Sequence, residues 1–145
     1  MSDNPTLTGQ DIGQAERATR ALLDAVLAET QTTFHQSVVL NLTVNTPSPA
    51  ELDGVVTRLT HGLKIDRSTA RDAIDQVVAK GLVATSGDPA SLALTPAGET
   101  RFRAIRHGID QIAERLYGDL PPEDLATTHR ILAIVTERAN AELAA

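Results

Sequence analysis

The segment RSTARDAID, residues 67–75, concentrates side chains that can bind a nucleic acid. An arginine guanidinium can donate two parallel hydrogen bonds to a guanine edge, and hydroxyl groups near a helix N-terminus suit bases or phosphates. A carboxylate is repelled by phosphates but can accept a hydrogen bond from a cytosine amine. The candidate contact residues are Arg67, Ser68, Thr69, Arg71, Asp72 and Asp75, and the alternative is that this face is merely solvated.

The other reactive side chains form no catalytic or metal-binding pattern. The four histidines, at positions 35, 61, 107 and 129, lie far apart, and none pairs with another at helical spacing. The chain has no cysteine, no Walker loop, no nucleophile elbow and no zinc-protease motif. We therefore expect no enzymatic activity, no metal site and no cofactor, and no motif supports a small-molecule enzyme on a helical scaffold.

Length and composition narrow the class of protein. The 145 residues suit a single domain, and the formal charge of −6 argues weakly against a nucleic-acid partner because phosphates attract clustered Lys and Arg. No positively charged start leads into an apolar run, and no run is long enough to span a membrane. We expect a cytoplasmic protein without a membrane partner.

Apolar periodicity and capping patterns predict two helices before residue 45. The first spans about 10–30, and the second spans roughly 34–44 because Thr33 and Gln36 have the spacing of a capping box. The stripe of the first helix comprises Ile12, Ala15, Thr19, Leu22, Leu23, Val26 and Leu27.

Two further helices are predicted on either side of Lys64–Asp66. The third starts near residue 49, with Ser48 as its cap, Pro49 at its first helical position and Glu51 closing a second capping box. The fourth is capped by Asp66 and ends before Gly81. Its spacing directs Ala70, Ala73, Ile74, Val77 and Val78 inward, which leaves the candidate contact residues outside, with Thr69 at the edge.

The remaining sequence predicts a hairpin and two helices. Alternating patches at 82–85 and 92–94 flank a turn at Ser86–Pro89. Thr95 caps a fifth helix, and a last helix follows the break at 118–122. The fifth helix carries a heptad-like seam of Phe102, Ile105, Ile109, Ile112 and Leu116, and such a seam needs a partner.

Helix, tight turn, helix and hairpin is the order of a winged helix-turn-helix. The run VTRLTHGLKIDRSTARDAIDQVVAKGLV, followed by LTPAG, resembles the MarR family of bacterial transcriptional regulators, as do TTFHQSVVL and LPPEDL. The resemblance implies a mainly α fold with a small β-hairpin, in one domain over 1–145. It places the winged helix-turn-helix lobe at about 34–95 and dimerisation helices at about 8–31 and 96–145.

The hairpin, or wing, departs from the family pattern. Family members commonly carry an Asp-x-Arg there, whereas ATSGDPASLAL is shorter and has no basic residue. Residues 48–95 hold five basic and six acidic residues, a net charge of −1, so we expect modest and salt-sensitive DNA affinity.

Basic residues early in the fifth helix allow two interpretations. Arg101, Arg103, Arg106 and His107 are either a solvated face beside the seam or, for Arg103 or His107, the wall of a pocket. The resemblance implies that such a pocket binds a small anionic or aromatic ligand.

Two functional hypotheses follow. The first is a homodimeric, ligand-responsive repressor that binds double-stranded DNA at a near-palindromic operator, with the outer face of the fourth helix as the reading element. The second is a winged-helix dimer with weak or lost DNA binding that serves as a protein-interaction module. The acidic reading helix and the bare wing are the features that favour the second.

Overall fold

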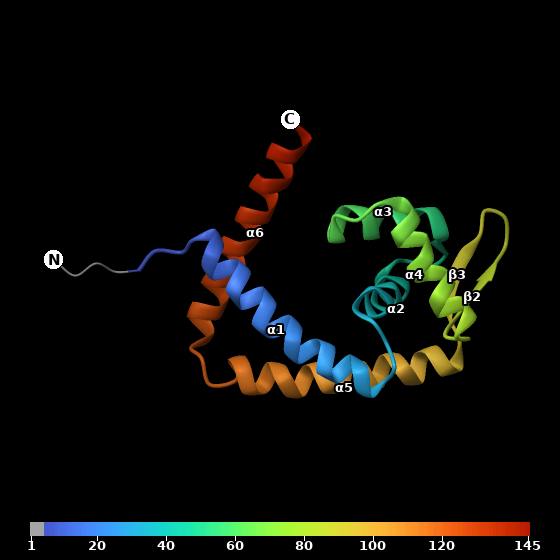
Figure 1. The fold of residues 1–145 in the computed structure, drawn as a ribbon, viewed down its shortest axis with the longest axis horizontal. Coiled ribbons are helices and arrows are strands. Elements are labelled where there is room, and N and C mark those ends of the chain that lie inside the picture. Colours follow the sequence, from blue (N-terminus) through green and yellow to red (C-terminus); the bar gives the residue numbers. More distant parts are fainter. Residues whose placement is uncertain (1–4) are drawn as a thin grey trace. The chain divides into compact units, whose positions relative to one another are not determined.

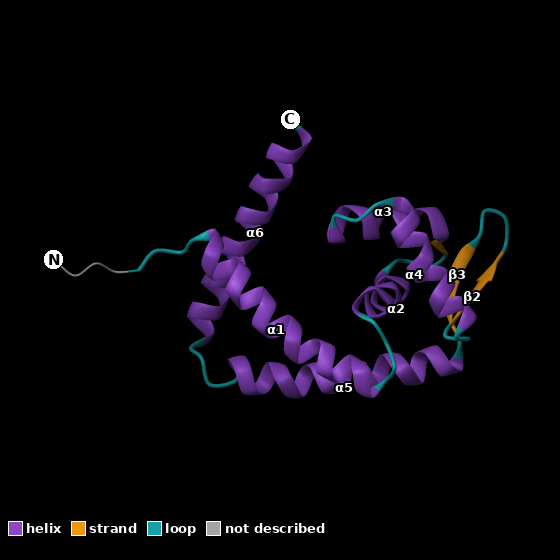
Figure 2. Ribbon diagram, viewed as in Figure 1, coloured by secondary structure: helices purple, strands orange, loops and turns teal. Residues whose placement is uncertain are grey.

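The computed structural model describes residues 5–145, which form six helices and a small sheet (Figures 1 and 2). The mainly helical winged-helix prediction is confirmed. The helices are α1 (Gly9–Glu29), α2 (Phe34–Asn45), α3 (Leu52–Leu63), α4 (Arg67–Ala79), α5 (Pro96–Tyr117) and α6 (Pro122–Ala144). The strands are β1 (Ala50–Glu51), β2 (Val83–Ser86) and β3 (Ser91–Leu94).

The chain forms two compact units, one ending at Ile109 and the other spanning Asp110–Ala145. The first unit contains α1 to α4, the sheet and the first part of α5. The second contains the rest of α5 and all of α6. The expectation of one domain over 1–145 stays a prediction.

The core of the first unit lies where α2, α3 and α4 meet the sheet. Burial of these aliphatic side chains supplies the main driving force for the fold. The largest fully buried side chains are Leu27, Val39, Leu40, Val55, Val56, Leu59, Ile74, Val77 and Val83. Phe102, Ile105 and Ile109 of the predicted seam pack on this core, so the chain itself covers that part of the seam.

The predicted start of the third helix is wrong. Ala50 pairs with Leu92 as part of β1, and Leu52 donates its backbone N–H to the Ala90 carbonyl at 2.9 Å. Glu51 is the N-cap of α3 but makes no side-chain capping bond. Ala50 is only 3% exposed, so burying it in the sheet replaces the capping box expected from Ser48 and Glu51. The hairpin is consequently part of a three-stranded sheet of order β1-β3-β2.

The capping predictions for α2 and α5 are confirmed. Thr33 accepts from the Gln36 N–H, and the Gln36 side chain accepts from the Thr33 N–H. Thr95 Oγ1 accepts from the Gly98 N–H at 3.0 Å and donates to the Gly81 carbonyl at 2.6 Å. The Thr95 hydroxyl therefore joins Gly81, just after the end of α4, to the first turn of α5.

Gly98 explains why the LTPAG motif requires a glycine. A Cβ at this position would overlap the carbonyl oxygen of Leu82, and backbone cannot yield as a flexible side chain can. The close approach positions the first turn of α5 against the residue that precedes β2.

The second unit leaves much of its apolar surface exposed. No residue of α6 is buried, although the helix carries Ile131, Leu132, Ile134 and Val135. Among the described residues, no helix is long and apolar enough to cross a membrane.

Candidate nucleic-acid interface

The start of α4 is fixed by a tight turn and a charged cap. Lys64 adopts a left-handed conformation with φ of 57°, and Asp66 then accepts from the Thr69 N–H at 2.7 Å. This backbone hydrogen bond, with a second contribution from the Thr69 side chain, lowers the pKa of Asp66 below its usual range. The ionised cap therefore defines Arg67 as the first residue of α4.

The burial of α4 matches the predicted faces. Ala70, Ala73, Ile74 and Val77 are buried, and Val78 is half-buried. The opposite face exposes Arg67, Ser68, Arg71, Asp72 and Asp75, and Thr69 is half-buried at its edge. The structure thus brings all six candidate residues together on one surface, while their role in DNA binding stays a prediction.

Arg67 and Arg71 differ in their intramolecular contacts. Arg67 donates to Asp53 Oδ1 of α3 at 3.3 Å and to Thr57 Oγ1 at 3.5 Å, so its guanidinium links the two helices. Arg71 makes no ion pair or side-chain hydrogen bond with any residue that the structure describes. The Arg71 guanidinium can therefore donate all its hydrogen bonds to a partner outside the chain. The sequence alone gave no sign of this difference between Arg71 and Arg67.

Polar contacts around one buried glutamine hold α4 to α2, and the sequence did not identify them as functional. Gln36 is 4% exposed, and its side-chain amide donates to Gln76 Oε1 at 2.7 Å. Lys80, the C-cap of α4, donates to Gln36 Oε1 at 2.8 Å and to the Gln31 carbonyl at 2.7 Å. Only the capping-box spacing of Gln36 was visible in the sequence, and it gave no sign of these long-range contacts.

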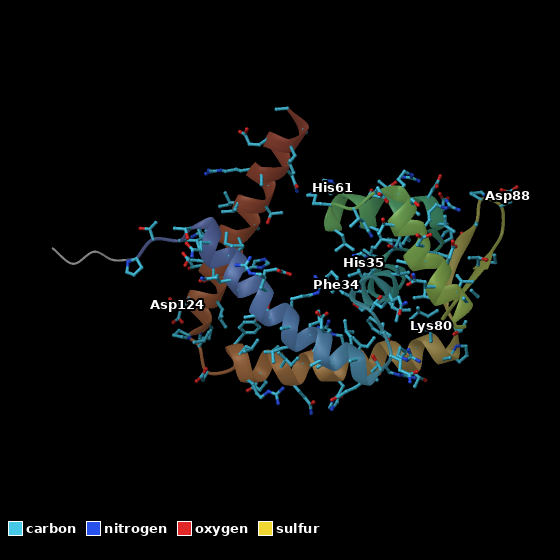
Figure 3. The ribbon with its side chains drawn as sticks, in the orientation of Figure 1. Phe34, His35, His61, Lys80, Asp88 and Asp124 are labelled. Atoms are coloured by element: carbon cyan, nitrogen blue, oxygen red, sulfur yellow. The ribbon has the colours of Figure 1, made fainter. Side chains whose placement is uncertain are left out.

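The wing offers no cation. Its turn passes through Gly87, which has a φ of 83°, and Figure 3 shows Asp88 at its tip. Gly87 suits this conformation because it lacks a Cβ. The wing therefore presents an acidic group where a phosphate backbone would favour a basic one.

The ligand-binding candidates on α5 are not brought to one site. Arg103 lines a cleft of about 710 Å³ with Phe102, the end of α2, β1 and β3; we call it the Arg103 cleft. His107 is exposed and is not among the residues that line this cleft. The cleft size falls in the range of small-molecule sites.

A second cleft touches the candidate interface itself. Thr69, Asp72 and Gln76 line a cleft of about 400 Å³ with Phe34 and His35 at the start of α2, which Figure 3 labels. Arg20 of α1 also lines it and lies 3.3 Å from the Phe34 ring centroid, a cation–π contact. Among residues 5–145, no three His, Cys, Asp or Glu side chains gather to hold a metal ion.

Comparisons with known proteins define the fold. No family model and no curated protein matches the sequence. The structure is similar to a MarR family transcriptional regulator from Silicibacter pomeroyi, with a TM-score of 0.77, 20% identity and coverage of 92% of this chain and 90% of that one. It is equally similar to the Staphylococcus aureus MarR in complex with salicylate and kanamycin, with a TM-score of 0.77, 14% identity and the same coverage.

A third similar structure is BpsR of Bordetella bronchiseptica, whose DNA binding is regulated by 6-hydroxynicotinic acid. It has a TM-score of 0.70 and 20% identity, and the match covers 92% of this chain and 99% of that one. The chain is therefore a winged helix-turn-helix protein. More narrowly, it has the MarR-type winged-helix fold.

Proposed function

We propose that the chain is a DNA-binding transcriptional regulator that reads the major groove with the outer face of α4. The observation that carries the proposal is Arg71, which projects from a buried and anchored helix without an intramolecular partner. The similar folds of MarR family transcriptional regulators support the same role for this helix.

Each residue of the face has a proposed part in the contact. Arg71 pairs with a base edge, and Ser68 and Thr69 bind bases or phosphates near the helix N-terminus. Arg67 positions α4 through Asp53 and adds positive charge beside the backbone. Asp72 and Asp75 weaken binding to unspecific sequences, and one of them can accept from a cytosine amine.

The regulator is proposed to act as a homodimer on a near-palindromic operator. Support comes from the apolar surface of α6, where Leu132 and Val135 are each 38% exposed and Leu143 is 72% exposed. A surface of this kind is commonly covered by a partner, and two-fold pairing would present two copies of α4 to two half-sites.

A small anionic or aromatic ligand is proposed to relieve repression. Arg103 supplies a cation to a cleft of suitable size, and two proteins of similar fold are described with salicylate and with 6-hydroxynicotinic acid. The part assigned to His107 rests on the sequence alone. The proposal places this non-enzymatic, cofactor-independent role in the cytoplasm.

The proposal is tested by selecting genomic fragments and random duplexes on the purified protein at two salt concentrations. Recovery of one palindromic sequence, bound more tightly than random DNA at both concentrations, is the expected result. Enrichment of no sequence at either concentration would contradict the proposal.

A dimeric protein-interaction module is the second candidate. Asp72, Asp75 and Asp88 place negative charge on the reading face and at the wing tip, which opposes contact with phosphates. This candidate predicts that the same selection enriches no sequence while the protein remains a dimer.

A further inference from the structure

A third cleft lies at the C-terminal end of α4, and none of the candidate interface residues lines it. It has a volume of about 490 Å³, and we call it the Lys80 cleft. It is lined by Glu29, Thr30, Gln31, Lys80, Leu82, Ala97, Thr100, Arg101 and Ala104. Figure 3 shows Lys80 at the end of α4, near the first turns of α5.

Two cations that line the Lys80 cleft have spare hydrogen-bond donors. The Lys80 ammonium has three N–H groups and uses two of them, toward the Gln31 carbonyl and Gln36 Oε1. Arg101 has five N–H groups and donates one hydrogen bond, from its NH1 to Thr32 Oγ1 at 3.2 Å. Both side chains are therefore held in place by the protein and still able to bind an anion.

The contacts also fix where these donors are. Gln31 adopts a left-handed conformation with φ of 54°, and its carbonyl accepts from Lys80 at 2.7 Å. Thr32, which accepts from Arg101, is 6% exposed. Because buried or backbone groups anchor both cations, little side-chain entropy is lost when a ligand binds.

The charge and the wall of the cleft indicate the class of anion. The charged residues that line the cleft are Lys80, Arg101 and Glu29, which gives the lining a net charge of +1. Glu29 forms no ion pair with either cation. A monoanion balances this charge, and a carboxylate matches the planar donor fork of arginine. Leu82, Ala97 and Ala104 supply an aliphatic wall, and no aromatic side chain lines the cleft.

We propose that the Lys80 cleft binds a short aliphatic carboxylate, held between the Lys80 ammonium and the Arg101 guanidinium. The bound anion joins the C-terminal end of α4 to α5. This site is separate from the Arg103 cleft and does not depend on DNA binding.

The test is a titration of the ¹⁵N-labelled full chain with sodium butanoate, at constant ionic strength and without DNA. We expect saturable shifts of the backbone amides of Gln31, Gly81 and Thr100, and no such shifts with butanamide, which has the same shape and no charge. Arg101→Gln should weaken butanoate binding at least about tenfold, the loss expected of one charge-assisted hydrogen bond.

Two further variants complete the design. Arg17→Gln removes the same charge from α1 and lines none of the three clefts, so it should leave butanoate binding unchanged. Lys80→Gln should also weaken binding, but it disturbs the anchor of α4, and the Arg101 variant therefore decides the outcome. Equal shifts with butanamide, shifts mapping to the Arg103 cleft, or an unaffected Arg101→Gln variant would each overturn the proposal. Because no DNA is present, none of these results bears on the proposed regulator.

Discussion

Replacing Arg71 by alanine tests the proposed contact between the Arg71 guanidinium and a base edge, on which the proposed function depends. The Arg71 side chain is exposed and forms no ion pair or side-chain hydrogen bond with the described residues. Its removal should therefore change the free energy of unfolding by no more than about 0.5 kcal/mol. Loss of a bidentate base contact should cost about 1–3 kcal/mol, or roughly fivefold to 150-fold in affinity for each half-site. A homodimer carries two copies, and distant sites add, so the cost on a symmetric operator is about 2–6 kcal/mol.

Arg67→Ala is the matched control, because it removes the same side chain from the same face of α4. The Arg67 guanidinium is held by Asp53, and both side chains of this pair are more than half exposed, at 56% and 83%. An exposed pair contributes about 0–1 kcal/mol to stability, so this variant should fold normally. Because Arg67 is already paired, its loss should weaken DNA binding less than the loss of Arg71.

The assay is fluorescence anisotropy of the selected operator and of single-base variants of it, at one fixed salt concentration, with urea unfolding in parallel. Arg71→Ala should also relax the preference at one operator position, which a loss of general charge would not do. Wild-type affinity in Arg71→Ala together with a larger loss in Arg67→Ala would refute the assignment of Arg71 as the base-reading residue.

Three other predictions test the fold and the assembly. Because the pKa of Asp66 is lowered in the folded state, its ionised carboxylate stabilises that state at pH values above the pKa of Asp66 in the unfolded chain. This stability is lost as the pH falls through the folded-state pKa of Asp66. Unfolding monitored by circular dichroism should show this acid-induced loss in wild type but not in Asp66→Asn, which keeps a cap without a charge. Gly98→Ala should lower the thermal midpoint because a Cβ there overlaps the Leu82 carbonyl, and a midpoint equal to that of wild type would show that the close approach is not required. Sedimentation at micromolar concentration should give a dimer for wild type and a monomer for Leu132→Asp/Val135→Asp, whereas a wild-type mass that is monomeric at every concentration would contradict the proposed assembly.

Local sequence signals predicted most helices because caps and periodicity act within a few residues. Asp66, Thr33 and Thr95 each cap the helix expected of them, and the buried face of α4 follows its apolar spacing. The start of α3 was mispredicted because β1 depends on pairing between Ala50 and Leu92, which lie far apart in the sequence. A local capping pattern could not reveal that competing contact.

At the candidate interface, too, the sequence predicted the local features but not the contacts between helices. Periodicity was sufficient to place Arg67, Arg71, Asp72 and Asp75 on one exposed face. It could not show that Asp53 holds Arg67, or that Gln36 anchors α4 through Gln76, because those partners come from other helices. The sequence could not show which of Arg103 and His107 lines a cleft, because several elements form a cleft; Arg103 lines the Arg103 cleft and His107 does not.

The most direct test of the central claim uses the two carboxylates on the reading face of α4. Asp72 and Asp75 are exposed and form no ion pair or hydrogen bond within the described structure, so Asp72→Asn/Asp75→Asn should preserve the fold. If this face meets DNA, removing the two charges should raise affinity for random duplexes and steepen its salt dependence.

The measurement is a titration of a labelled random duplex from about 50 to 200 mM salt, the range over which phosphate contacts change affinity most. The control variant Asp119→Asn/Glu123→Gln removes the same charge from two exposed positions, one in the turn before α6 and one in its first turn. We predict tighter and more salt-sensitive binding for the Asp72/Asp75 variant alone, with a smaller gain on the selected operator. Unchanged affinity for random DNA at low salt would contradict the claim that α4 meets DNA and would favour the interaction module.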